Sequence, residues 1–217
     1  LFVVMMLDID VTAMREGWVK FLDGVRGTYP LGYDTPDDGS LAPQYVIERI
    51  GAVRAAAPQA RLVVDANESW DITLLQRIGG MLAALAVELI EQPLPAAADA
   101  ALQGLVPDVM LCADESCHTA ADVDRLPEAY GMVNVKLDKA GGLTEALRVL
   151  EAARAGGRKV MVGCMVATSL GIAPAMLLAA HADVVDLDGP LWLAHDRGDP
   201  LRFSEGWVYP PEPALWG

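Results

Sequence analysis

Two patterns of hydrophobic and polar residues alternate along the chain from about residue 44 onward. Short apolar runs typical of buried parallel strands occur at residues 61–65, 87–91, 109–114, 133–137, 159–164 and 183–188. Between them, apolar residues at helical spacing predict helices at residues 44–57, 72–85, 119–130, 142–157 and 169–182, and a helix or loop at residues 95–107. Six strands separated by helices predict a parallel α/β sheet with right-handed crossovers.

The N-terminal part of the chain follows a less regular pattern. Residues 1–10 are typical of a strand, and residues 11–24 of a helix or turn. Residues 27–43 are dense in glycine, proline and aspartate, which favours a long loop. We therefore divide the chain into an irregular N-terminal segment, residues 1–44, and a regular α/β domain, residues 45–217.

Composition and charge restrict the functions that are open to the chain. Its residues are 53% hydrophobic, but charged residues interrupt the apolar stretches, so none is long enough to span a bilayer. The net charge of −14 argues against a nucleic-acid partner, because phosphate binding requires basic patches. The first ten residues lack the basic start of a signal peptide. Because the three cysteines also suit a reducing compartment, we expect a soluble, cytoplasmic protein without a membrane partner.

Three of the predicted strands end in a carboxylate. Asp65, Glu91 and Asp114 follow apolar runs and lie 26 and 23 residues apart, about the length of one βα unit. In a parallel barrel the strand ends share one face, so the three side chains could converge there. Converging carboxylates repel one another, and an all-oxygen set of this kind suits Mg²⁺. The alternative is that each carboxylate only caps the helix after its strand.

A lysine follows at the end of the next strand. Lys136 lies 22 residues after Asp114, in register with the three carboxylates. A nearby cation and partial burial would favour the neutral form of this lysine, which is how an ammonium group becomes a base near neutral pH. A solvated loop lysine is the alternative interpretation.

Six segments connect this pattern to a known family. In chain order they are VDANESW, IEQPLP, CADES, NVKLDKAGG, VGCMVATS and VDLDGPLWL. With them, residues 45–217 resemble the barrel domain of the enolase superfamily, in the muconate-lactonizing-enzyme subgroup that includes dipeptide epimerases and N-acyl-glutamate racemases. The superfamily is known for a lysine or histidine base beside Mg²⁺. The resemblance implies a TIM-like (β/α) barrel, which we expect to be N-terminally shortened and to lack the usual capping domain.

The resemblance also implies roles for individual residues. Asn67 would line the metal site, Lys139 would support or neutralise it, and the loop that contains Cys164 would approach the substrate. Asp186 and Asp188 alternate along the last predicted strand, and in dipeptide epimerases the matching pair binds the free ammonium group of the dipeptide. The alternatives are a turn asparagine, a solvated lysine, a packing cysteine and two carboxylates that close a strand.

A racemase needs a second acid or base on the opposite face of its planar intermediate. In the family this is a lysine of a KxK motif before the first metal ligand, but residues 36–40, where it is expected, contain no lysine. Lys20 is the upstream candidate, with Trp18 in place of the first lysine of the motif. Its alignment requires residues 27–39 to be an insertion, which loops tolerate.

These expectations lead to one function and one alternative. The first is a Mg²⁺-dependent epimerase or racemase that abstracts the α-proton next to a carboxylate of a glutamate-containing dipeptide or N-acyl-glutamate, through an enediolate. The alternative is an incomplete metal-binding barrel without racemase activity. One-sided chemistry, as in o-succinylbenzoate synthase or the cycloisomerases, also stays open. The partner would be a small-molecule substrate, and a homo-oligomer could supply parts that the chain lacks.

Overall fold

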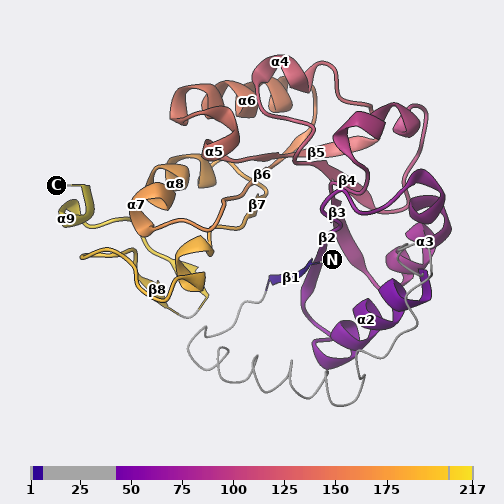
Figure 1. Cartoon of the computed structure of the whole chain (residues 1–217), viewed down its shortest axis with the longest axis horizontal. Coiled ribbons are helices and arrows are strands. Elements are labelled where there is room, and N and C mark those ends of the chain that lie inside the picture. The colour runs from indigo at the N-terminus through magenta and orange to yellow at the C-terminus, as the bar shows by residue number, and fades with distance from the viewer. Residues whose placement is uncertain (1, 7–42, 205, 217) are drawn as a thin grey trace.

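The computed structural model describes residues 2–6, 43–204 and 206–216. Seven strands form one open, curved sheet whose spatial order follows the chain from β1 to β7 (Figure 1). Strands β2 to β7 pair in parallel, and β1 pairs antiparallel with β2. The result is a TIM-like half barrel. The helix or turn expected at residues 11–24 and the loop expected at residues 27–43 lie outside the described residues, except that Pro43 begins a helix.

The strands agree closely with the apolar runs of the sequence. Their bounds are β1 (Phe2–Met6), β2 (Arg61–Asp65), β3 (Val87–Glu91), β4 (Met110–Ala113), β5 (Tyr130–Val135), β6 (Lys159–Val162) and β7 (Val184–Val185). A separate antiparallel pair consists of β8 (Phe203–Ser204) and β9 (Trp207–Val208). The six predicted parallel strands are therefore confirmed, although the last one is shorter than predicted.

Helices and 3₁₀ turns lie between successive strands, and α9 follows the last strand. They are α2 (Pro43–Ala56), α3 (Ile72–Ala84), η1 (Ala96–Leu102), α4 (Ala120–Val123), α5 (Leu137–Ala140), α6 (Leu143–Ala155), α7 (Ser169–Ile172), η2 (Ala173–Ala175), α8 (Met176–Ala179), η3 (Gly189–Trp192) and α9 (Pro213–Trp216). The single helix predicted at residues 169–182 is wrong in detail. Pro174 lies in the 3₁₀ turn η2 that separates α7 from α8, because proline has no N–H for a continuous helix.

The two faces of the sheet carry different layers of residues. Leu62, Val64, Ile90 and many others pack with helix residues such as Ile78 in one large core between the strands and the helices. The opposite face has a smaller apolar layer with one buried residue from each parallel strand. We call it the inner apolar layer, and its members are Val63, Leu89, Cys112, Met132, Met161 and Val184. The alternation of side chains along each strand separates these two cores.

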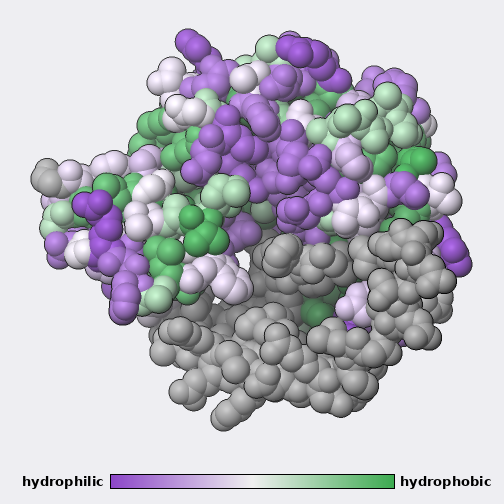
Figure 2. All heavy atoms as spheres, viewed as in Figure 1, coloured by the Kyte–Doolittle hydropathy of each residue, from purple (hydrophilic) through white to green (hydrophobic). Residues whose placement is uncertain are grey.

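The outer surface of the described part is mixed in polarity. Hydrophilic residues cover much of the face shown in Figure 2, and hydrophobic residues are scattered among them. In the described ranges, no helix has both the length and the apolar character needed to cross a membrane.

The N-terminus of α3 offers a local test of this fold. Asp71 is its N-cap, and the Asp71 carboxylate accepts a hydrogen bond of 2.7 Å from the backbone N–H of Leu74. We expect Asp71→Ala to lower the free energy of unfolding by about 1 kcal/mol, measured by urea denaturation. Asp71→Asn keeps an acceptor and should retain most of the stability. An equal loss in both variants would contradict the capping role of the hydrogen bond.

Candidate active site

Four of the candidate site residues, with two further residues, form a layer directly above the inner apolar layer, at the carboxyl ends of the parallel strands. Each lies two residues after a member of the inner apolar layer, so its side chain starts from the same face of the sheet. We call these positions the polar layer. From β2 to β7 they are Asp65, Glu91, Asp114, Asn134, Gly163 and Asp186. All three predicted metal ligands belong to this layer.

Asp114 is paired with two lysines. Lys136 Nζ lies 2.6 Å from Asp114 Oδ2, and Lys139 Nζ lies 2.5 Å from Asp114 Oδ1. Lys139 also donates hydrogen bonds to the backbone carbonyls of Asp114 and Asn134, at 2.5 and 2.9 Å. Burial acts to raise the pKa of Asp114, but Lys139 and Lys136 outweigh it and lower this pKa. Asp114 is therefore an anion that the chain itself neutralises.

Glu91 is in the opposite situation. Its side chain is buried, with only 4% of the residue exposed, and it accepts one hydrogen bond of 2.6 Å from Asn134 Nδ2. Burial, and after it the charges of the nearby carboxylates Asp114 and Asp65, raise the pKa of Glu91 to about 8. A buried carboxylate in this environment is poorly stabilised as an anion without added positive charge.

Asp65 is oriented by the turn that follows β2. The strand ends at Asp65, and Asn67 lies in the turn after it, which is the alternative that the sequence left open. Asn67 has a positive φ of 47°, and its backbone N–H donates to Asp65 Oδ1 at 2.8 Å. Burial raises the pKa of Asp65, while the hydrogen bonds from Asn67 act against this rise. Asn67 thus orients the Asp65 carboxylate through a hydrogen bond within the turn.

The residue types of this layer fit a hard divalent cation. They offer three carboxylates from adjacent strands, and none of the described basic side chains lies at ion-pair distance from Glu91. Among the described residues, however, no three Asp, Glu, His or Cys side chains lie close enough together to hold an ion. Asp114 contacts Lys136 and Lys139 instead, so a cation would have to compete with both lysines for this carboxylate.

Lys136 is the first residue after β5. It has an extended backbone and therefore follows Asn134 on the same face. Burial acts to lower the pKa of Lys136, as the sequence predicts, but Asp114, Glu91 and Glu115 outweigh it and raise this pKa. Without a competing cation, Lys136 is held as an ammonium group.

The predicted pair Asp186 and Asp188 lies just beyond β7. The strand ends at Val185, so the two aspartates do not alternate along a strand as predicted. They nevertheless contact each other, and burial followed by the charge of Asp188 raises the pKa of Asp186 to about 6. Trp192 Nε1 donates a hydrogen bond of 2.9 Å to Asp188 Oδ2, although 69% of Trp192 is exposed. Two carboxylates in contact favour a positively charged ligand.

The loop after β6 rests on the segment that contains these aspartates. A Cβ atom on Gly189 would lie 2.5 Å from the carbonyl oxygen of Met165 and 3.2 Å from Cys164 Sγ, so glycine is required for this approach. Burial raises the pKa of Cys164 to about 11, which makes the thiol a packing group rather than a nucleophile. The loop therefore lies against the segment that follows the aspartates, and its approach to a substrate stays a prediction.

Gln92 is a supporting residue that the sequence analysis missed. Its fully buried amide accepts hydrogen bonds from the backbone N–H groups of Asp114 and Ser116, at 2.8 and 3.1 Å. The same amide donates to Ser116 Oγ, to Tyr130 Oη and to the carbonyl of Leu94. Gln92 therefore holds the loop that positions Asp114. The available signal was its place directly after Glu91.

Two further points concern the extent of the site. Lys20, the candidate second base, lies outside the described residues.

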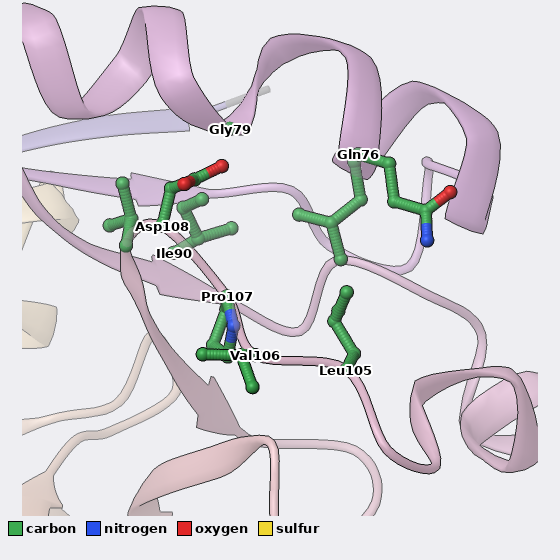
Figure 3. Close-up of a pocket in the computed structure, with 9 residues that line it drawn as sticks. Gln76, Gly79, Ile90, Leu105, Val106, Pro107 and Asp108 are labelled. Carbon is green, nitrogen blue, oxygen red and sulfur yellow. The ribbon is translucent and has the colours of Figure 1, made fainter.

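A hollow of about 90 Å³ lies between α3 and the loop before β4 (Figure 3). The residues that line it include Ile90 and Val106. Ile90 belongs to the helix-facing core, so this hollow lies on the opposite face of the sheet from the polar layer. Its volume is well below the roughly 300 Å³ of a small ligand site.

Comparisons with known proteins show the family to which this fold belongs. Residues 18–214 match the protein family described as "Enolase C-terminal domain-like". An N-acetyl-D-glutamate racemase from a Pseudoalteromonas species is 46% identical over 82% of this chain and 56% of its own length. An L-Ala-D/L-Glu epimerase from Escherichia coli K12 is 49% identical over 74% of this chain and 50% of its own length. The chain spans about half the length of the curated relatives that it matches.

Solved structures show the same similarity. An enolase family member from Agrobacterium tumefaciens, with homology to dipeptide epimerases and with bound sodium and L-Ala-L-Glu, has a TM-score of 0.75 and 50% identity, over 78% of this chain and 52% of that one. A dipeptide epimerase from Cytophaga hutchinsonii, complexed with Mg and D-Ala-L-Val, has a TM-score of 0.74 and 27% identity, over 79% of this chain and 51% of that one.

The Gln92 network predicts a large effect on stability. In Gln92→Leu, buried N–H groups of the Asp114 loop lose their acceptor, so we expect the free energy of unfolding to fall by about 2–4 kcal/mol in chemical denaturation. The same change at an exposed glutamine, Gln76→Leu, should stay within about 0.5 kcal/mol. Similar values for the two variants would contradict the role of the network.

The aspartate pair predicts an unusual titration. We expect the Asp186 carboxyl carbon to titrate near pH 6 in an NMR measurement, and Asp188→Asn to move the midpoint down toward the ordinary 3.8. Because the folded-state pKa is raised, this group stabilises the fold most below pH 3.8 and loses its contribution as the pH rises through about 6. A wild-type midpoint near 4 would contradict the contact. Asp108→Asn, at an exposed position, is the control.

Proposed function

The chain belongs to the enolase C-terminal domain-like family, and on this basis we propose that it carries the barrel part of an isomerase. The reaction would remove and return the α-proton next to a carboxylate, in a glutamate-containing dipeptide or an N-acyl-glutamate. The activities named for the two curated relatives support this choice of substrates. Because the chain spans only about half of their length, the activity is a proposal for the protein as a whole.

One observation carries the proposal. Lys136 Nζ lies 2.6 Å from Asp114 Oδ2, directly above a polar layer in which three carboxylates occupy the ends of adjacent parallel strands. Proton abstraction next to a carboxylate places a second negative charge on the substrate. The reaction therefore requires a base and, beside it, a site that concentrates positive charge.

The residues of the polar layer would hold the cofactor and the substrate carboxylate. Asp65, Glu91 and Asp114 would bind Mg²⁺, which when bound neutralises the charge that develops on the substrate carboxylate. Asn67 would keep Asp65 in position. Lys139 would hold the ends of β4 and β5 together through its hydrogen bonds to the backbone carbonyls of Asp114 and Asn134.

The proton transfer itself would involve two lysines. Lys136 Nζ would take the α-proton on one face of the substrate. Return of a proton on the other face would give the opposite configuration, and Lys20 is the proposed donor there, as the sequence suggests. The Lys136 side chain is only 14% exposed, which would limit the access of bulk water to its ammonium group.

The aspartates beyond β7 would choose between the two substrate classes. Asp186 and Asp188 form a negatively charged pair that suits the free ammonium group of a dipeptide, whereas an N-acyl group carries no such charge. The loop that contains Cys164 and Met165 would cover this end of the substrate, because it rests on Gly189. A dipeptide is therefore the substrate that we favour.

A cytoplasmic location and a homo-oligomer stay predictions for this chain.

Proton NMR in D₂O tests the proposal. With Mg²⁺ and the chain, we expect the glutamate α-proton signal of L-Ala-L-Glu to disappear, more slowly for N-acetyl-glutamate, and EDTA to stop the exchange. Lys136→Ala should slow the exchange by at least about 100-fold, because it removes the base. Lys159→Ala changes an exposed lysine at the start of β6 and is the matched control.

The outcomes separate the proposal from its alternatives. Folded protein that binds Mg²⁺ but exchanges neither compound would contradict the proposal and favour a metal-binding barrel without racemase activity. Exchange without formation of the other stereoisomer would indicate one-sided chemistry and would contradict the role of Lys20.

A further inference from the structure

One position in the polar layer has a neutral amide side chain. Asn134 lies on β5 among the four carboxylates of the layer, two residues after Met132 and two before Lys136. It is 1% exposed, so its amide is almost completely removed from water. Buried amides are normally satisfied by hydrogen bonds, because an unsatisfied polar group is costly in this environment.

The amide of Asn134 is directed at Glu91. Its Nδ2 donates to Glu91 Oε1 at 2.6 Å, a short distance for a hydrogen bond to a carboxylate. The two residues lie on β5 and β3, so the hydrogen bond crosses the intervening strand β4 within the polar layer. With Oε1 engaged in this way, the rotation of the Glu91 carboxylate is restricted, and no hydrogen bond to Oε2 comes from the residues that the structure describes.

The neighbouring strand makes room for this amide. Gly163, the polar-layer residue that follows β6, has no side chain, and a Cβ atom there would lie 2.6 Å from Asn134 Oδ1 and 2.7 Å from Asn134 Nδ2. Any other residue at position 163 would push the amide away from its present place. Asn134 Oδ1 is itself buried without a hydrogen-bond partner among the described residues, a cost that stability alone does not explain.

We propose that Asn134 is a positioning residue that orients Glu91 for cation binding, with Gly163 providing the space that it occupies. The inference rests on the metal site of the proposed function. In this role, Asn134 would act on the cation only through Glu91. Partners of this kind usually change metal affinity by about 10- to 100-fold when they are removed.

Metal affinity tests the inference without any need for turnover. The probe is Mn²⁺, and free ion is counted by electron paramagnetic resonance during titration of the 217-residue chain. In Asn134→Leu, a side chain of similar length without a donor, we expect the dissociation constant for Mn²⁺ to rise by about 10- to 100-fold. Met132→Leu is the matched control, because it lies on the same strand and face but one layer below. It should bind as the wild type does.

Two further variants keep the test decisive. Asn134→Ser replaces the leucine variant if that variant does not fold. Serine is too short to reach Glu91 and adds no bulk, so we expect the same loss of Mn²⁺ affinity. Gly163→Ala should weaken Mn²⁺ binding in the same direction, because it displaces the amide while leaving Asn134 in place. Affinities of the folded Asn134 variants within twofold of the wild type would overturn the inference alone. A wild-type chain that is folded and does not bind Mn²⁺ would overturn the proposed metal site, and the inference with it.

Discussion

Repulsion between buried carboxylates is the constraint on which this end of the molecule depends. Asp65, Glu91 and Asp114 follow the ends of adjacent parallel strands, above a layer of apolar residues that keeps water out from below. Burial and the neighbouring charges raise the pKa of Glu91 to about 8, which expresses the cost of placing these groups together. Any stable arrangement must supply positive charge or hydrogen-bond donors to the layer.

The chain meets this requirement in a different way for each carboxylate. Two ammonium groups lie within 2.6 Å of Asp114, a backbone N–H and an amide from Asn67 face Asp65, and one amide faces Glu91. Glu91 therefore has the weakest compensation of the three. If the proposed metal site is correct, Glu91 is therefore the carboxylate that a bound cation would stabilise most.

Support for the layer comes from buried groups that do not take part in the chemistry. Gln92 ties the loop after β4 to the end of β3, so that Asp114 cannot move independently of Glu91. At the other edge, Gly189 lets the loop after β6 rest on the segment after β7. These contacts make the strand ends one connected unit, although they come from residues far apart in the sequence. The family match over residues 18–214 is consistent with a barrel domain built around such a unit.

The sequence by itself determined the six parallel strands and the positions of three carboxylates and Lys136 at or just after strand ends. Apolar runs and βα spacing are local properties of a chain, so they can be read without the fold. It also indicated the family through short segments. It could not show that Asp114 pairs with two lysines, that Asp186 and Asp188 meet beyond a strand of two residues, or that Asn134 reaches Glu91 across β4. Those contacts depend on the curvature of the sheet and on the rotamers of buried side chains, which only the tertiary structure decides.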